Sequence, residues 1–259
     1  EFLFSFSMLV EGKVIIVTGA SMGIGLAVSR LLAASKAKVV LAARSADKLT
    51  ELQKEIPDSH FIVTDMCKSS DVDRMIEGTR EKYGRIDVLI NNAGGAHGVE
   101  RIEDGRDGDW ETMFQSNALG ILRVTRAVLP LMKPHPGGII LNIGSIAGRV
   151  AYEGGSAYCA SKAAERSITK SLRLELNGTG LRVGTIDPGM AETEFSVVRL
   201  KGDRAKADAV YKGVTPLSAG DVAEAIVWSA NRPAHVCIDE ILIMCTAQAA
   251  PYKVHRSEG

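Results

Sequence analysis

A tyrosine and a lysine stand four residues apart at Tyr158 and Lys162, and Ser145 precedes the tyrosine by thirteen residues. Residues four apart lie one above the other on one face of a helix, so these two side chains are predicted to be neighbours. A nearby ammonium group favours the phenolate and lowers the pKa of a phenol. Such a phenol can pass a proton to or from an alcohol as a general acid or base. The spacing by itself is weak evidence, because both residue types are common.

The composition is that of an ordinary globular domain. With 259 residues, 46% of them hydrophobic, the chain is long enough to bury a sizeable core. Its formal net charge is zero, which removes any global electrostatic argument for nucleic acid or an anionic membrane as a partner. The four cysteines show no C-x-x-C or zinc-type spacing, so we interpret them as reduced thiols of a cytoplasmic protein. The five histidines are scattered, and no metal site is expected.

From residue 13 onward, short apolar runs alternate with longer amphipathic segments. The runs are apolar throughout rather than at every second position, as in strands that helices cover on both faces. This alternation predicts an α/β fold, a single Rossmann-type doubly wound domain whose seven-stranded parallel sheet is flanked by helices on both faces. The expected strands are residues 14–18, 39–43, 60–64, 88–91, 138–144, 182–187 and 240–244, and the expected helices are residues 24–34, 46–56, 70–83, 110–132, 157–176 and 221–231.

No linker, repeat or low-complexity tract divides the chain, so one domain is the economical interpretation. We expect this domain to span residues 9–249. Met8 is interpreted as a plausible natural start and the residues before it as upstream sequence, so residues 1–8 are set apart from the domain. The segment 250–259 has no periodicity that indicates a structure, and an interface arm and disorder both stay open for it.

Glycines cluster directly after the first predicted strand, where Gly19, Gly23 and Gly25 form the pattern G-x-x-x-G-x-G. Glycines at such a turn allow a tight bend, a close backbone approach to a pyrophosphate and close packing of helix on strand. The N–H groups at the start of the following helix then face the phosphates. The pattern therefore predicts a dinucleotide site at the carboxyl ends of the strands, with a plain strand–helix turn as the alternative.

From residue 9 to about residue 249, the chain resembles the short-chain dehydrogenase/reductase family. The motifs that carry the resemblance stand in the family's order at the ends of the predicted strands. Each is modest alone, but their joint occurrence is very specific. They are residues 18–25, Asn91-Asn92-Ala93-Gly94, Asn117, Ser145, Tyr158 with Lys162, and Pro188-Gly189 with Thr193.

The resemblance implies a catalytic set of Asn117, Ser145, Tyr158 and Lys162. Tyr158 would give its proton to the carbonyl oxygen during reduction, or take it from the alcohol during oxidation, and Ser145 would hydrogen-bond the same oxygen. Lys162 would lower the pKa of Tyr158 and hold the nicotinamide ribose. Asn117 would hold a water that relays protons to solvent. Without the family, Asn117 would be interpreted as a helix-surface amide and Ser145 as a loop serine.

The second predicted strand ends in Ala43-Arg44, where an NAD enzyme would carry an acid that bonds the ribose 2′-hydroxyl. The guanidinium of Arg44 suits a 2′-phosphate, which favours NADP(H) over NAD. Many relatives carry a second basic residue nearby, whereas Met22 and Ser45 occupy the usual places here, and Lys48 is a further candidate. The cofactor-binding residues that the resemblance implies are Gly19, Ser21, Met22, Gly23, Ile24, Gly25, Arg44, Asp65, Met66, Asn91, Ala93, Gly94, Tyr158, Lys162, Pro188, Gly189 and Thr193.

The region after Pro188-Gly189, residues 190–214, is expected to form a mobile substrate lid. Its sequence resembles one branch of the family, the NADP-dependent 3-hydroxy acid dehydrogenases of the serine and allo-threonine type, also described as broad carbonyl reductases. A carboxylate on the substrate needs a cation to bind it. Arg149 and Arg199 are the basic residues best placed in the sequence, with a surface arginine as an equally good interpretation of each.

The predicted reaction is the NADP(H)-dependent interconversion of a secondary alcohol and a carbonyl, with a small 3-hydroxy acid as the expected substrate. Within the enzyme class, a 3-oxoacyl-thioester (acyl-carrier-protein) reductase is the alternative, because it uses the same catalytic residues. A catalytically silent nucleotide-binding module is a further alternative, although all four catalytic positions are filled. The resemblance also implies a homodimer or homotetramer in which the helices at 110–132 and 157–176 pair.

Overall fold

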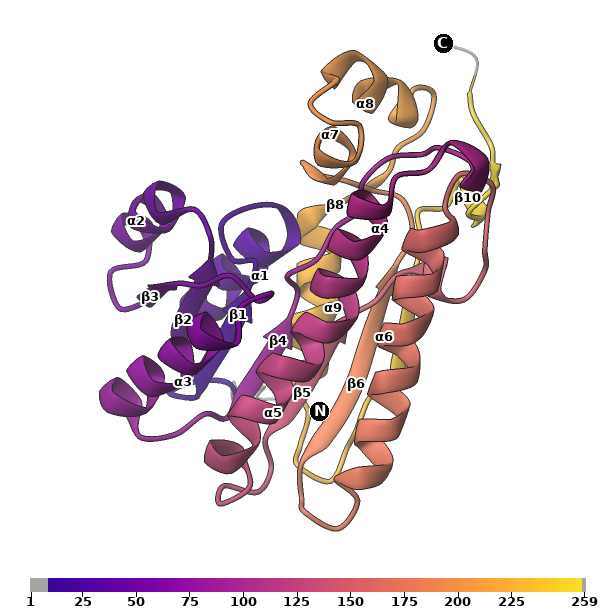
Figure 1. Ribbon diagram of the computed structural model, residues 1–259. Coiled ribbons are helices and arrows are strands. Elements are labelled where there is room, and N and C mark those ends of the chain that lie inside the picture. Colours follow the sequence, from indigo (N-terminus) through magenta and orange to yellow (C-terminus); the bar gives the residue numbers. More distant parts are fainter. Residues whose placement is uncertain (1–8, 258–259) are drawn as a thin grey trace, which may run out of the picture.

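The computed structural model describes residues 9–257 of the chain. Seven parallel strands form the central sheet in the order β3-β2-β1-β4-β5-β6-β9 (Figure 1), which confirms the predicted fold class. The residues predicted to be upstream, 1–8, and the last two residues of the tail, 258–259, lie outside the described part. The strands of this sheet are β1 (Val14–Thr18), β2 (Lys38–Ala43), β3 (His60–Val63), β4 (Val88–Asn91), β5 (Ile139–Ile143), β6 (Arg182–Pro188) and β9 (Glu240–Ile243).

Helices alternate with these strands along the chain. The α-helices are α1 (Gly23–Ala34), α2 (Ala46–Glu55), α3 (Ser69–Tyr83), α4 (Asp107–Phe114), α5 (Gly120–Met132), α6 (Ser156–Glu175), α7 (Phe195–Arg199), α8 (Arg204–Tyr211) and α9 (Ala219–Ala230). Between residues 9 and 257, none of the helices combines the length and the apolar character needed to cross a membrane. Outside the large sheet, β7 (Ala191–Glu192) pairs with β8 (Leu217–Ser218), and β10 (Gln248–Ala250) pairs with β11 (Lys253–Val254).

Two apolar clusters fill the two faces of the sheet, because successive side chains of a strand point to opposite faces. Ile15 and Val17 of β1 belong to the cluster that α1, α2 and α9 cover. Val14 and Ile16 belong to the cluster beneath α3, α5 and α6. All residues of β1 and β5 are buried, which accounts for the unbroken apolar runs in the sequence.

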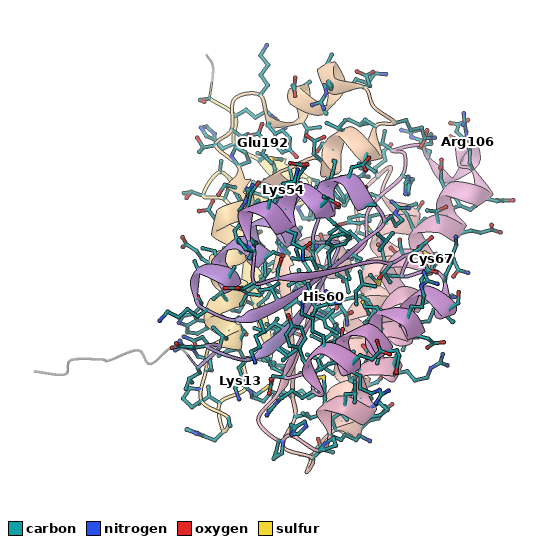
Figure 2. The ribbon with its side chains drawn as sticks, turned by 90° about the vertical axis from the view of Figure 1, so that its left-hand side faces the viewer. Lys13, Lys54, His60, Cys67, Arg106 and Glu192 are labelled. Atoms are coloured by element: carbon teal, nitrogen blue, oxygen red, sulfur yellow. The ribbon has the colours of Figure 1, made fainter. Side chains whose placement is uncertain are left out.

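The sheet is less buried at one edge than at its centre. Figure 2 views the molecule from this edge, where His60 begins the outermost strand β3 and Lys54 lies on α2. The residues of β3 are partly or fully exposed, whereas those of the central strands β1 and β4 are buried. The buried centre of the sheet is therefore the rigid part on which a site can be built.

The direction of strand progression reverses between β1 and β4. From β1 the chain adds β2 and β3 on one side, and from β4 it adds β5 and β6 on the other. In such sheets the crevice outside the carboxyl ends of the two central strands binds ligands. The short helices α7 and α8, which belong to the expected lid region, stand beyond the carboxyl ends of these strands (Figure 1).

One predicted helix is interrupted. The segment expected at 110–132 begins earlier, at Asp107, and a π-helical turn, η2 (Gln115–Leu119), separates α4 from α5. Asn117 is fully buried in this turn. Isolated π-helical turns occur mostly at functional sites, because the extra residue redirects nearby side chains. The hydrophobic periodicity does not reveal the turn, since helical backbone continues through it.

Candidate active site

A large cleft of about 530 Å³ opens at the carboxyl ends of the central strands. It is lined by most of the residues that the sequence predicts for the site, including three of the four catalytic candidates. Gly25, Asn91 and Asn117 do not line it. The predicted residues that do are Gly19, Ser21, Met22, Gly23, Ile24, Arg44, Asp65, Met66, Ala93, Gly94, Ser145, Tyr158, Lys162, Pro188, Gly189 and Thr193.

The glycine turn after β1 is held by the end of β4. The Thr18 hydroxyl accepts hydrogen bonds from the backbone N–H groups of Asn92 and Ala93, both at 2.9 Å. The Asn92 side chain donates in return to the carbonyl of Thr18 at 2.9 Å. Gly19 has a φ of +66°, and a Cβ on Gly25 would collide with the Gly19 carbonyl. Gly25 is therefore a packing residue of the turn rather than part of the cleft wall.

The start of α1 suits a pyrophosphate. Its first turn contains no acidic residue, and no side chain caps its N-terminus. The backbone N–H groups and the positive end of the helix dipole are therefore available to an anion in the cleft. Met22 and Gly23 lie at this terminus and line the cleft. Residues and geometry together fit the phosphates of a dinucleotide.

The end of β2 suits the adenosine half of such a cofactor. Arg44 is exposed and lines the cleft together with Ala43 and Asp65. The Asp65 side chain accepts the N–H of Cys67 at 3.0 Å, and the Asp65 N–H donates to Asp71 at 3.1 Å. No carboxylate stands at position 43, so nothing there repels a 2′-phosphate. Lys48 is exposed on α2 and does not line the cleft. Cys67 also lines the cleft, although the sequence motifs do not predict it.

The catalytic candidates meet where β5 ends and α6 begins. Ser145 follows β5 and caps the short 3-10 helix η3 (Ile146–Gly148), its hydroxyl accepting the N–H of Ala147 at 3.1 Å. Tyr158 and Lys162 lie one turn apart on α6, and both are buried. The Lys162 ammonium donates to the carbonyl of Ile143 at 2.6 Å. Ser145, Tyr158 and Lys162 therefore face one space from two rigid elements.

Burial is the main influence on the pKa values of Tyr158 and Lys162. Burial raises the pKa of the Tyr158 phenol, while a hydrogen bond with Ser145 and the charge of Arg199 act to lower it. Burial also lowers the pKa of Lys162, against the attraction of Glu165 and Asp187. The pKa of Tyr158 is therefore raised, because desolvation outweighs the groups that favour the phenolate.

Asn117 lies outside the cleft and forms hydrogen bonds to two segments of the site. Its side-chain amide donates to the carbonyl of Gly95 at 2.8 Å and to the Ser161 hydroxyl at 3.0 Å, and its oxygen accepts the N–H of Gly95 at 2.9 Å. Ser161 donates onward to the Tyr158 carbonyl at 2.8 Å. Asn117 therefore ties the loop after β4 to the helix that carries Tyr158. Its oxygen also accepts the Ser116 hydroxyl at 3.2 Å, so the side chain forms four hydrogen bonds.

Asn91 is also placed outside the cleft. Its side chain is buried and donates to Asn142 at 2.9 Å and to Thr125 at 3.2 Å. These bonds join β4 to β5 and α5 beneath the site. Asn91 thus supports the central strands, and the wall itself is formed by the residues that follow it.

The two arginine candidates have different surroundings. Arg149 is paired with Asp187 at 2.6 Å and with Glu240 at 2.6 Å, and it does not line the cleft. Arg199, on α7, lines the cleft and lies over the rings of Tyr152 and Tyr158, 5.5 and 5.6 Å from their centroids. Two carboxylates already neutralise the charge of Arg149, which leaves Arg199 as the candidate that can bind a substrate carboxylate.

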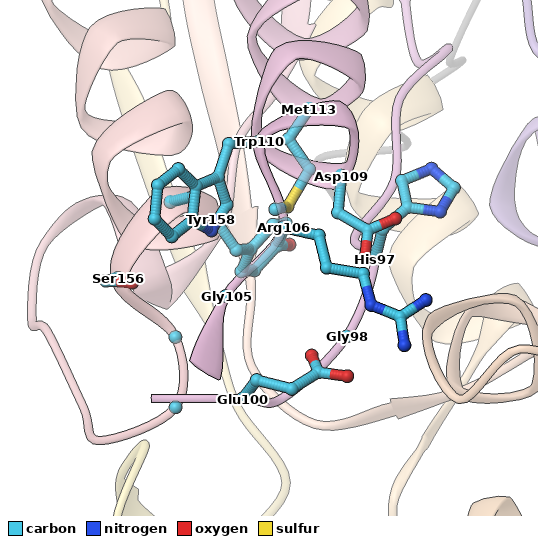
Figure 3. A pocket seen from close by; sticks show the side chains of 13 residues that line it. His97, Gly98, Glu100, Gly105, Arg106, Asp109, Trp110, Met113, Ser156 and Tyr158 are labelled. Atoms are coloured by element: carbon cyan, nitrogen blue, oxygen red, sulfur yellow. The ribbon is translucent and has the colours of Figure 1, made fainter. Parts of the chain in front are cut away.

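Aromatic side chains form a wall that the sequence did not identify. Tyr152, Phe195 and Tyr211 line the cleft, and the Phe195 ring lies 5.5 Å from that of Tyr158. They come from a loop and from the two lid helices, so no common spacing links them. A smaller cavity of about 10 Å³ lies beside Tyr158, among Trp110, Asp109 and Glu100 (Figure 3). It holds about one water and offers no space for a substrate.

A doubly wound sheet with a glycine turn after its first strand, and a serine beside a buried tyrosine and lysine, is typical of an oxidoreductase of the dinucleotide-binding type. The short chain dehydrogenase family matches residues 13–203, and the chain belongs to this family.

Relatives match over nearly their whole length. The NADP-dependent 3-hydroxy acid dehydrogenase of Schizosaccharomyces pombe is 40% identical over 96% of this chain and 98% of its own. Sulfoacetaldehyde reductase 2 of Chromohalobacter salexigens is 41% identical over 91% of this chain and 95% of its own. Among solved structures, the closed form of serine dehydrogenase complexed with NADP+ superimposes with a TM-score of 0.90 and 38% identity, covering 94% of this chain and all of that one.

Proposed function

We propose that the protein is an NADP(H)-dependent oxidoreductase that interconverts a secondary alcohol and a carbonyl, with a small 3-hydroxy acid as its substrate. The observation that carries the proposal is one continuous cleft. It joins Arg44 and the open N-terminus of α1, beside β2, to Ser145, Tyr158 and Lys162, beyond β5. This arrangement fits a dinucleotide laid across the central strands.

The proposed chemistry assigns a role to each catalytic side chain. When bound, NADP supplies the nicotinamide carbon that accepts or donates the hydride. In oxidation the Tyr158 phenolate takes the proton of the substrate hydroxyl, and in reduction the phenol returns it to the carbonyl oxygen. Ser145 donates a hydrogen bond to that oxygen as its charge changes. Lys162 holds its ammonium near the phenol, and Asn117 keeps α6 in place.

Arg199 supports a substrate that carries a carboxylate. Its guanidinium donates to the Tyr152 hydroxyl at 2.8 Å and to the carbonyls of Gly98 and Gly154 at 3.1 and 3.2 Å. All three acceptors are neutral, and no carboxylate within residues 9–257 forms an ion pair with it. Its positive charge is therefore uncompensated beside Tyr158. The names of the relatives, which act on hydroxy acids or a sulfonated aldehyde, agree with an anionic substrate.

Replacement of Arg199 by Met should separate charged from uncharged substrates. We expect kcat/KM for a 3-hydroxy acid to fall about ten- to a hundredfold, the value of a hydrogen bond to a charged group, and that for an uncharged secondary alcohol to fall much less. Arg204→Met is the matched control, since Arg204 is exposed on α8 and does not line the cleft. An equal loss on both substrates would contradict the assignment.

A comparison of substrates tests the function itself. We expect a higher kcat/KM for NADP-dependent oxidation of L-allo-threonine or 3-hydroxyisobutyrate than for NADPH-dependent reduction of an acetoacetyl thioester. Both reactions can be followed by the change in NADPH absorbance. Faster thioester reduction would instead establish the alternative, a 3-oxoacyl-thioester reductase. Turnover of neither, nor of any carbonyl in a broad panel, would establish the catalytically silent module.

The domain organisation is part of the proposal. We propose a domain of residues 9–249 with a lid at 190–214 that closes over the substrate. Within the lid, the Ser196 hydroxyl meets the Tyr211 hydroxyl at 2.6 Å, which supports movement of α7 and α8 as one unit. The tail reaches the end of the lid, because the Ser257 N–H donates to the Gly213 carbonyl at 2.9 Å.

We further propose a homodimer or homotetramer in the cytoplasm. Leu119, Leu122 and Leu174 are exposed on the helical segment 107–132 and on α6, which supports pairing of these helices between copies. The four cysteines are free, as is usual in a reducing compartment.

A further inference from the structure

A buried carboxyl group lies behind the proposed catalytic lysine. Glu165 follows Lys162 by three residues on α6 and is fully buried. Acidic side chains are almost never buried completely unless they are paired. The proposed mechanism assigns this one no role.

Three side-chain oxygen atoms lie close together around Gly144, which follows β5 and precedes Ser145. A Cβ on Gly144 would lie 2.8 Å from Oε2 of Glu165 and 2.9 Å from the Thr185 hydroxyl, and it would collide with Oδ1 of Asp187. Only glycine leaves room for them. The three oxygens belong to α6 and β6, so this point joins the catalytic helix to the strand beside β5.

One of these oxygens receives no hydrogen bond from a neighbouring group in the described part of the chain. The Thr169 hydroxyl donates its one proton between Oε1 of Glu165 at 2.8 Å and the backbone carbonyl of Glu165 at 3.0 Å. The Thr185 hydroxyl donates its single proton to Asp187 at 2.8 Å. Oε2 of Glu165 is buried and, within residues 9–257, has no hydrogen-bond partner. A hydroxyl that donates one bond can still accept another. A proton on Glu165, donated to Thr185, would satisfy every member of this group.

The neighbouring charges agree with a neutral Glu165. Asp187 on β6 and Glu240 on β9 are both paired with Arg149, which follows β5, and Glu240 also accepts from Arg166 of α6 at 3.2 Å. These ion pairs are complete without Glu165. Burial raises the pKa of Glu165, and the charge of Asp187 adds to this, while Lys162 and the hydroxyls of Thr169 and Thr185 oppose it.

We propose that Glu165 is a positioning residue that remains protonated, linking α6 at Lys162 to β6 beneath Gly144 and Ser145 without neutralising the lysine. This inference rests on the proposed roles of Ser145, Tyr158 and Lys162. The reason for a neutral group is electrostatic: an ionised Glu165 would oppose formation of the Tyr158 phenolate, which senses its charge. A protonated one supplies the same hydrogen bonds and leaves the ammonium free to act on the phenol.

Two substitutions at Glu165 separate its hydrogen bonds from its charge. Glu165→Gln keeps a donor and an acceptor, so we expect kcat within about threefold of the wild type. Glu165→Leu removes every side-chain hydrogen bond from α6 to Thr185 and should cost about tenfold or more. In the pH profile of kcat/KM for alcohol oxidation, the fall in rate at low pH reports protonation of the Tyr158 phenolate. We expect the pH of this fall to be the same in both variants as in the wild type. A shift of this fall to lower pH in both variants would show that a negative charge had been removed, and would overturn the proposal. An equal loss of kcat in the two variants would also overturn it.

Infrared difference spectroscopy tests the protonation state without any turnover. We expect the wild type at neutral pH to show the carbonyl band of a protonated carboxyl that Glu165→Gln lacks. Glu175→Gln, at the exposed end of the same helix, is the control and should remove only a carboxylate band. Loss of a carboxylate band in Glu165→Gln would refute the proposal. This result holds whichever substrate the enzyme uses, so it is separable from failure of the proposed function.

Discussion

Replacement of Tyr158 by Phe should lower kcat by about a hundred- to ten-thousandfold, the range that a positioned general acid or base contributes. The change removes only the hydroxyl, and the buried ring keeps its contact with Phe195, so α6 and the cleft should be unaltered. Single-turnover kinetics with a hydroxy acid would measure the loss. NADPH binding, followed by its fluorescence, should remain close to that of the wild type.

The same chemical change on a neighbouring tyrosine provides the control. Tyr152 lines the same cleft, and its hydroxyl accepts a hydrogen bond from Arg199 rather than from Ser145. Tyr152→Phe should therefore cost about tenfold or less, because one hydrogen bond between Arg199 and a neutral group is lost. Retained turnover in Tyr158→Phe, or equal losses in the two variants, would remove Tyr158 from the mechanism.

Replacement of Arg44 by Ala should change the choice of cofactor. We expect kcat/KM for NADP to fall about ten- to a hundredfold and that for NAD to stay nearly constant, because a charge-assisted bond to the 2′-phosphate is lost. The ratio of the two kcat/KM values at fixed ionic strength is the measurement. Arg44 is exposed, so the free energy of unfolding should change little.

Lys48 is the matched control for this experiment, since it is the other basic residue near the end of β2. It lies on the exposed side of α2 and outside the cleft. Lys48→Ala should leave both cofactors unaffected. If Arg44→Ala weakened NADP and NAD equally, the guanidinium would be binding a part that the two cofactors share, and the NADP assignment would fail.

The sequence predicts the sheet because its strands are buried on both faces. A strand such as 14–18 must then be apolar at every position, and this local signal survives without knowledge of its neighbours. The glycine turn is predictable for a similar reason, since Gly19 and Gly25 stand where any side chain would collide. Spacing along one helix likewise predicts that Tyr158 and Lys162 share a face.

Contacts between distant segments of the chain cannot be predicted in this way. Residues far apart in the chain are joined by the bonds of Asn117 to Gly95 and Ser161, by the pairing of Arg149 with Asp187 and Glu240, and by the placement of Arg199 over two tyrosine rings. Arg149 and Arg199 are equally plausible carboxylate ligands by residue type. Only the fold shows that one is neutralised and the other is not.

The sequence by itself therefore determined the doubly wound fold, the glycine turn after β1 and the tyrosine–lysine pair, because each depends on local geometry or on the burial of one element. The tertiary structure decided the state of the groups around that pair. The pKa of Tyr158 is raised by burial, and Glu165 meets Asp187 and Thr185 only because α6 packs against β6 at Gly144. Desolvation and through-space charge depend on which elements meet, and residue spacing along the chain carries no such information.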